Sequence, residues 1–148
     1  MRKLLLSVII LLTAIEMAPA QEYKVITIVE SIVPAGLGRS RIVENQGAID
    51  INAITTERDG GKSNTGDIKR GDIKKEGENM KETKLLNFYS LAGINFGNIA
   101  ANDAVIAAKM NEMTKEGWQL VHITSGVESD AGDKDGNGIF ITRMYWKK

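Results

Sequence analysis

Apolar and polar residues alternate most regularly near the start of the chain, between Glu22 and Ile32. β-branched residues dominate this segment, and such residues fit the pleated surface of a sheet. One face carries Tyr23, Val25, Thr27 and Val29, and the other carries Ile26, Ile28 and Ile32. Because both faces hold apolar side chains, the pattern predicts a strand that is buried on both sides.

Two more alternating segments lie near the end of the chain, at residues 118–124 and 139–146, with a polar, glycine-rich connection between them. They predict an antiparallel hairpin whose loop is longer than a usual hairpin turn. Two shorter extended segments are predicted upstream, one between Gly38 and Gly47 and one over residues 49–56.

Helical spacing appears between residues 102 and 117. Ile106, Met110 and Met113 recur at three- or four-residue intervals, which predicts a helix with one apolar face. Asn102 or Asp103 is expected to cap its start, and Gly117 is expected to end it. The apolar cluster at residues 85–91 fits either a short helix or a strand.

Apolar side chains almost vanish between Asp59 and Lys81, where Ile68, Ile73 and Met80 are the exceptions. Such a segment buries too little apolar area to offset the entropy lost on ordering it. We therefore expect a solvated, largely disordered loop at about residues 59–81. The whole pattern predicts an α+β fold: a small, mostly antiparallel sheet with one main helix packed on one face, plus a long disordered insert.

The first 20 residues have the three parts of a secretory signal peptide. Arg2 and Lys3 are basic, residues 4–15 are mainly apolar, and residues 18–20 are small at the expected cleavage site. The apolar run is shorter than the roughly 20 residues that a membrane-spanning helix needs. We therefore expect an exported protein, periplasmic or extracellular, with a single domain over residues 21–148 and no permanent membrane anchor.

The composition of the mature chain limits its partners and its chemistry. Removing Arg2 and Lys3 from 19 basic residues, and Glu16 from 19 acidic ones, leaves 17 against 18. This balance gives no general attraction for nucleic acid, which we do not expect as a partner. The chain has no cysteine, so no disulfide can form and packing alone must stabilise the domain.

Four segments of the chain belong together: the opening Glu22-Tyr23-Lys24-Val25, the stretches at residues 110–113 and 116–120, and the closing residues 139–143. Together they resemble a family of short bacterial domains of unknown function. Gln119 stands where that family usually has Glu, and residues 34–93 have no counterpart in its compact members. Through its stretches at residues 36–41 and 124–132, the chain is also similar to exported hypothetical proteins of Gram-negative bacteria. Neither resemblance implies a known activity.

The resemblance also carries structural expectations. Gly117 should adopt a left-handed conformation that ends the helix, and Trp118 should then place its ring under that helix. Arg143 on the last strand is expected to project toward a carboxylate, with Glu116 and Glu22 as candidates.

The glycine-rich connection contains the first half of a calcium-binding loop. Asp133, Asp135 and Asn137 place oxygen ligands at alternate positions, and Gly138 follows them where the tight turn needs a glycine. The twelfth position would be Met144 instead of Glu, which excludes an EF-hand. A looser calcium site that borrows Glu128 or Asp130 remains open, against the alternative that these residues serve only the turn.

Gly36 to Arg41 suggests an anion site, in which backbone amides and the guanidinium groups of Arg39 and Arg41 would hold the ligand. The alternative is a plain turn followed by an exposed strand. The sequence matches neither a Walker loop nor a dinucleotide-binding fingerprint.

Catalytic chemistry has no clear anchor in the sequence. His122 is the single histidine, and Ser125 and Ser129 lie outside any nucleophile-elbow motif. We therefore predict a non-enzymatic binding or interaction domain for a protein or small ligand, with no catalytic residue and no required cofactor. The alternatives are a calcium-binding module and a hydrolase that uses Ser125 or His122.

Overall fold

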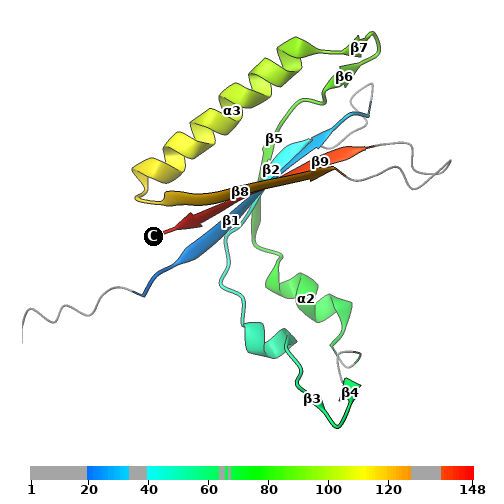
Figure 1. The fold of residues 1–148 in the computed structure, drawn as a ribbon, viewed down its shortest axis with the longest axis vertical. Coiled ribbons are helices and arrows are strands. Elements are labelled where there is room, and N and C mark those ends of the chain that lie inside the picture. The colour runs from blue at the N-terminus through cyan, green and yellow to red at the C-terminus, as the bar shows by residue number, and fades with distance from the viewer. Residues whose placement is uncertain (1–19, 34–39, 64–65, 67, 128–137) are drawn as a thin grey trace, which may run out of the picture.

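The computed structural model describes residues 20–33, 40–63, 66, 68–127 and 138–148. Its main feature is a five-stranded antiparallel sheet in the order β5-β2-β1-β9-β8, with the long helix α3 on one face (Figure 1). The fold class is therefore the α+β arrangement that the sequence predicted. The sheet strands are β1 (Tyr23–Ser31), β2 (Arg41–Asn45), β5 (Met80–Lys84), β8 (Gln119–Val127) and β9 (Ile139–Lys147), and α3 spans Phe96–Lys115.

Four predicted strands are confirmed. β1 is the predicted opening strand, and β9 pairs with it over its whole length, from Tyr23 opposite Lys147 to Ser31 opposite Ile139. β8 and β9 form the predicted antiparallel hairpin. β2 is the extended segment predicted between Gly38 and Gly47. The loop of the β8–β9 hairpin and most of the predicted signal peptide lie outside the described residues.

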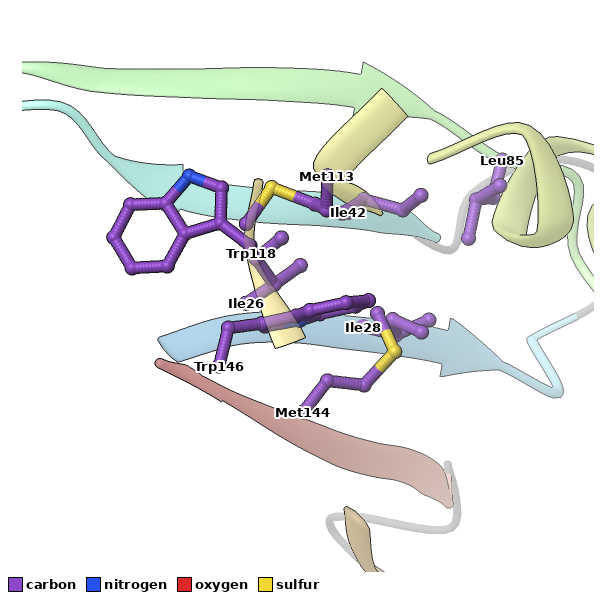
Figure 2. Close-up of a cluster of buried hydrophobic side chains, with 8 residues drawn as sticks. All are labelled: Ile26, Ile28, Ile42, Leu85, Met113, Trp118, Met144 and Trp146. Carbon is purple, nitrogen blue, oxygen red and sulfur yellow. The ribbon is translucent and has the colours of Figure 1, made fainter. Parts of the chain in front are cut away.

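The hydrophobic core lies between α3 and one face of the sheet. Figure 2 shows its eight buried side chains, which come from four strands or their flanks and from the helix end. They are Ile26, Ile28, Ile42, Leu85, Met113, Trp118, Met144 and Trp146. Val105, Ile106 and Met110 of α3 pack against this cluster and remain partly exposed.

The prediction that β1 is buried on both sides is wrong. Ile26 and Ile28 face α3 and are buried, whereas Tyr23 is 65% exposed and Val25 is 43% exposed on the other face. Alternation shows that both faces can be apolar, but it does not show whether a second layer covers each face. The sheet therefore has one covered face and one open face.

The helix begins earlier than predicted. Asn95 caps it, with its side chain accepting a hydrogen bond from the Asn98 backbone N–H at 3.1 Å. Asn102, a predicted cap, is instead buried in mid-helix, where its amide bonds Leu86 of the neighbouring loop. Asn is common at helix starts, so the local preference of Asn102 could not predict that its side chain would instead bond a neighbouring segment.

The helix ends as predicted. Gly117 has φ of 89°, and the N–H groups of Gly117 and Trp118 bond the carbonyl oxygens of Thr114 and Met113. These paired bonds form a Schellman motif. Trp118 then turns into the core and is 8% exposed, with the ammonium groups of Lys24 and Lys148 5.7 and 5.8 Å from its ring centre.

The chain between β2 and β5 extends away from the sheet, on the side opposite α3 (Figure 1). It holds the 3-10 helix η2 (Ile51–Ile54), the strands β3 (Arg58–Asp59) and β4 (Lys62–Ser63), and the helix α2 (Arg70–Glu76). η2 replaces the extended segment predicted over residues 49–56. The predicted polar loop also ends sooner, because Met80 and Lys81 belong to β5.

Residues 85–91 form no helix. They run irregularly into a small hairpin of β6 (Tyr89–Ser90) and β7 (Gly93–Ile94), which leads to α3. Leu85 enters the core, and the ring of Phe88 lies 5.6 Å from that of Phe140 on β9. This segment therefore fills the end of the core beyond the helix start.

Candidate functional site

The open face of the sheet presents three rows of side chains across β1, β9 and β8. In the central row, Thr27, Arg143 and Thr124 lie directly beside one another. The other two rows are Val25, Tyr145 and His122, and Val29, Ile141 and Gly126. Because residues in register share a face, these side chains all point away from α3. The open face therefore has a polar centre, with aliphatic and aromatic side chains on both sides of it.

Arg143 is the charged group at the centre of this face. It is exposed, and no carboxylate among the described residues lies within ion-pairing distance. The prediction that Glu116 or Glu22 would pair with it is wrong. Glu22 precedes β1 and Glu116 caps the end of α3, whereas the register places Arg143 in the middle of the sheet.

A depression of about 390 Å³ adjoins Arg143. Its lining includes Thr124, Gly126, Ile139 and Ile141. A side chain at Gly126 would find no atom within 4 Å of its first carbon, so the glycine leaves this space open. The depression therefore joins an apolar floor to a guanidinium and a hydroxyl group.

The two residues of the hydrolase hypothesis lie on opposite faces of β8. The imidazole of His122 is on the open face, 5.9 Å from the Tyr145 ring. The Ser125 hydroxyl is on the α3 side and lies 2.8 Å from the Thr142 hydroxyl. A strand separates them, so these two side chains cannot form a nucleophile and base pair. Ser129 lies outside the described residues.

The predicted anion site at Arg39 and Arg41 is only partly described. Arg39 lies outside the described residues. Arg41 is on β2, where its guanidinium pairs with the Glu82 carboxylate of β5. Three strand intervals separate β2 from β8, or about 14 Å at the usual strand spacing. Arg41 and His122 therefore do not share a pocket.

The predicted calcium ligands Asp133, Asp135 and Asn137 lie outside the described residues, as do Glu128 and Asp130. Within the described ranges, no group of three or more His, Cys, Asp or Glu side chains is arranged to hold a metal ion. The calcium site therefore stays a prediction.

Sequence reasoning missed a buried ion network between α3 and the sheet. Lys109 is 6% exposed, and its ammonium lies 2.7 Å from Glu44 and 2.6 Å from Glu112. Burial acts to lower the pKa of Lys109, but hydrogen bonds to Glu112 and Glu44 outweigh it and raise that pKa. The hydrogen bond from Lys109 lowers the pKa of the Glu112 carboxyl. The signal in the sequence was Glu44, which alternates with Ile42 on the core side of β2.

A second polar cluster joins the end of β1 to its surroundings. The Ser40 hydroxyl accepts a hydrogen bond from the Ser31 N–H at 2.9 Å and donates one to Asn87 at 2.8 Å. Nearby, Glu30 accepts a hydrogen bond from the Asn102 amide at 3.0 Å. These groups satisfy one another, so we assign the cluster a structural role.

No known protein family, curated protein or solved structure matches the chain. Within the part of the chain that is described, no helix has the length and apolar character needed to cross a membrane. The geometry of the open face is therefore the main guide to function.

Proposed function

We propose that this protein is an exported, non-enzymatic binding domain that holds an anionic group of its ligand or partner at Arg143 on the open face of the sheet. One observation carries the proposal: an exposed guanidinium lies between Thr27 and Thr124 without a carboxylate among the described residues. Arginines in sheets commonly serve cross-strand ion pairs, as Arg41 does with Glu82. Since none of the described carboxylates pairs with Arg143, its guanidinium can take an external anion instead.

The chemistry of the site suits a carboxylate with an apolar body. A guanidinium can hold both oxygens of a carboxylate or phosphate through parallel hydrogen bonds. The hydroxyl of Thr124 can donate another, and the floor at Ile139 and Ile141 can contact a hydrocarbon chain. The volume of about 390 Å³ is at the small end for ligand pockets, and the site is open to solvent. We therefore expect modest affinity for a small ligand and tighter binding for a partner that covers more of the face.

Export rests on the signal peptide predicted over residues 1–20. Mass spectrometry of the native protein should find an N-terminus at Gln21. Detection of Met1 on the native protein would contradict export by this route.

Hexanoate is a suitable first probe, because it carries a carboxylate on a short apolar chain. We expect hexanoate to shift the backbone amide signals of Thr124, Gly126 and Arg143 in NMR spectra of the mature protein. Hexan-1-ol has a similar apolar chain without the charge and should shift these signals much less. The two probes therefore separate anion binding from simple apolar contact.

Matched variants locate the binding group. Arg143→Gln should abolish the hexanoate-specific shifts, because a neutral amide cannot replace the guanidinium. Arg41→Gln removes a guanidinium on another strand and should leave them unchanged. Equal responses to hexanoate and hexan-1-ol, or an unchanged response in Arg143→Gln, would count against the proposal.

A further inference from the structure

The two edges of the sheet differ sharply in charge. The edge strand β5 has five residues, of which Lys81, Glu82 and Lys84 are charged. The edge strand β8 has nine residues, all exposed, and none is Lys, Arg, Asp, Glu or Pro. Its exposed apolar side chains include Ile123 at 47% and Val127 at 59%.

An edge strand offers unpaired backbone N–H and C=O groups to any strand that approaches it. Proteins usually protect such edges with charges, prolines, bulges or very short strands. β5 has the first of these protections, its charged side chains. β8 has one bulge, between Leu120 and His122, which leaves residues 123–127 regular and unprotected. The difference indicates that this part of β8 is a pairing surface.

We propose that β8 pairs antiparallel with β8 of a second copy of this chain, in a register centred on Ser125, so that two five-stranded sheets become one. The proposal rests on the sheet edge and does not depend on anion binding at Arg143. It assigns the strand one occupant, a second identical chain.

The sequence of β8 is self-complementary in this register. Ile123 lies opposite Val127 of the second copy on the α3 side, and the reverse pair repeats the contact. Ser125 lies opposite its own copy between these two apolar pairs. On the other face, Thr124 lies opposite Gly126, where an added side chain atom would meet nothing within 4 Å. Cross-strand apolar pairs of this kind stabilise antiparallel sheets.

Charge also favours a second copy. Pairing about a two-fold axis places some residues opposite themselves or near their own copies, so that a charged strand would repel itself. β8 contains no Lys, Arg, Asp or Glu, so self-pairing brings no like charges from these residue types together.

The position of α3 leaves room for the second copy. Ion pairs join Lys109 to Glu44 of β2 and Glu112 to Lys81 of β5, so the helix lies over the half of the sheet away from β8. Figure 1 shows β8 at the near edge, with its end far from the corner that joins it to α3. Both helices would lie on the same face of the joined sheet, because the two-fold axis is perpendicular to it.

Sedimentation velocity of the mature protein tests the proposal. One pair of edge strands buries less surface than the roughly 1,600 Å² of a standard interface. We therefore expect a reversible dimer, and the fraction of dimeric protein should rise with protein concentration. Ser125→Lys and Ser125→Glu should each be monomeric, because equal charges would meet at the axis. An equimolar mixture of the two variants should recover the dimer, because opposite charges then meet. Met80→Lys adds the same charge to β5 and should dimerise like the wild type.

A cysteine variant provides a second test that does not require a charge at the edge. The chain has no natural cysteine, so Ser125→Cys introduces a single thiol. Residues opposite each other in an antiparallel pair have Cα atoms about 4.5–5.5 Å apart, within disulfide range. Mild oxidation should therefore link Ser125→Cys into dimers much faster than Met80→Cys.

Three results would each overturn the proposal. They are a wild type that stays monomeric up to millimolar concentration, a mixture of the Lys and Glu variants that stays monomeric, and equal oxidation rates for the two cysteine variants. Arg143→Gln separates this result from anion binding. It removes the guanidinium of the depression but leaves the β8 edge unchanged, so it should lose the hexanoate response and still dimerise like the wild type.

Discussion

At the scale of single residues, Glu30 shows how burial changes a carboxyl group without a metal or substrate. Its side chain lies on the α3 side of β1 and is partly buried. Burial raises the pKa of Glu30 above its ordinary value of 4.5, the hydrogen bond from Asn102 opposes that rise, and the charge of Asp103 adds to it. Ionisation of Glu30 is therefore less favourable in the folded protein than in the unfolded chain.

We predict that Glu30→Gln stabilises the protein at neutral pH, by less than about 1 kcal/mol because solvent still screens the site. The amide keeps an oxygen that can accept the hydrogen bond from Asn102. Because the pKa of Glu30 is higher in the folded protein than in the unfolded chain, ionisation of its carboxyl group lowers the stability of the fold as the pH rises through the folded-state pKa. Below pH 4.5 the carboxyl group is protonated in both states, and this loss of stability is absent. Thermal unfolding at several pH values should show a benefit that shrinks on acidification. Glu22→Gln, on an exposed residue before β1, should show no such trend.

At the scale of elements, an ion network and the core together fix α3 to the sheet. The Glu44 side chain is 3% exposed and forms ion pairs with Lys109 and Lys24, whose ammonium nitrogens lie 2.7 and 3.7 Å from its carboxylate oxygens. Removing one partner of a buried ion pair leaves the other charge without compensation, which is more costly than replacing both with apolar groups.

We therefore predict that Lys109→Met lowers the free energy of unfolding by about 3 kcal/mol, the lower end of the usual range for a broken buried pair, because Lys24 still contacts Glu44. Urea denaturation measures this change. The double variant Lys109→Met with Glu44→Leu should recover most of the loss. A double variant as unstable as the sum of the two single variants would show that the pair is not energetically coupled.

At the scale of the whole molecule, the excursion between β2 and β5 is separate from the core. Between Gln46 and Asn79, every residue whose exposure the structure describes is exposed or only partly buried. The Gln46 N–H donates to the Asn79 carbonyl at 2.6 Å, so the two ends of the excursion are already adjacent. The sheet thus closes beneath the insert as an ordinary antiparallel pair.

We predict that replacing residues 47–78 with Asn-Gly changes the free energy of unfolding by no more than about 1 kcal/mol, because Asn-Gly forms the tight turn such a pair needs. Denaturation and NMR spectra of the shortened protein test this. Deleting residues 88–94 is the contrasting variant. It removes the Phe88 contacts with Phe140 and Ser31 and should destabilise the fold strongly. A shortened protein that fails to fold would contradict the separation of insert and core.

Local sequence patterns predicted where the helices and strands lie better than they predicted which residues contact one another in the fold. The alternation in β1, β8 and β9 was sufficient to place these strands, and Gly117 was sufficient to place the end of α3. The helix start was missed because Asn102 has the local preference of a cap and the tertiary role of a buried amide. The pairing of Arg143 was predicted wrongly because the sequence near β9 does not reveal which strands lie beside it.

The sequence by itself determined the strands β1, β2, β8 and β9, the helix end, the polar insert and the α+β class, because each depends on the spacing of side chains along a few neighbouring residues. Tertiary structure alone decided that one face of the sheet stays open, that Lys109 is buried against Glu44, and that His122 and Ser125 point to opposite sides. It also decided that β8 is an edge. These features depend on strand order and on the position of one helix, which contacts between distant segments establish.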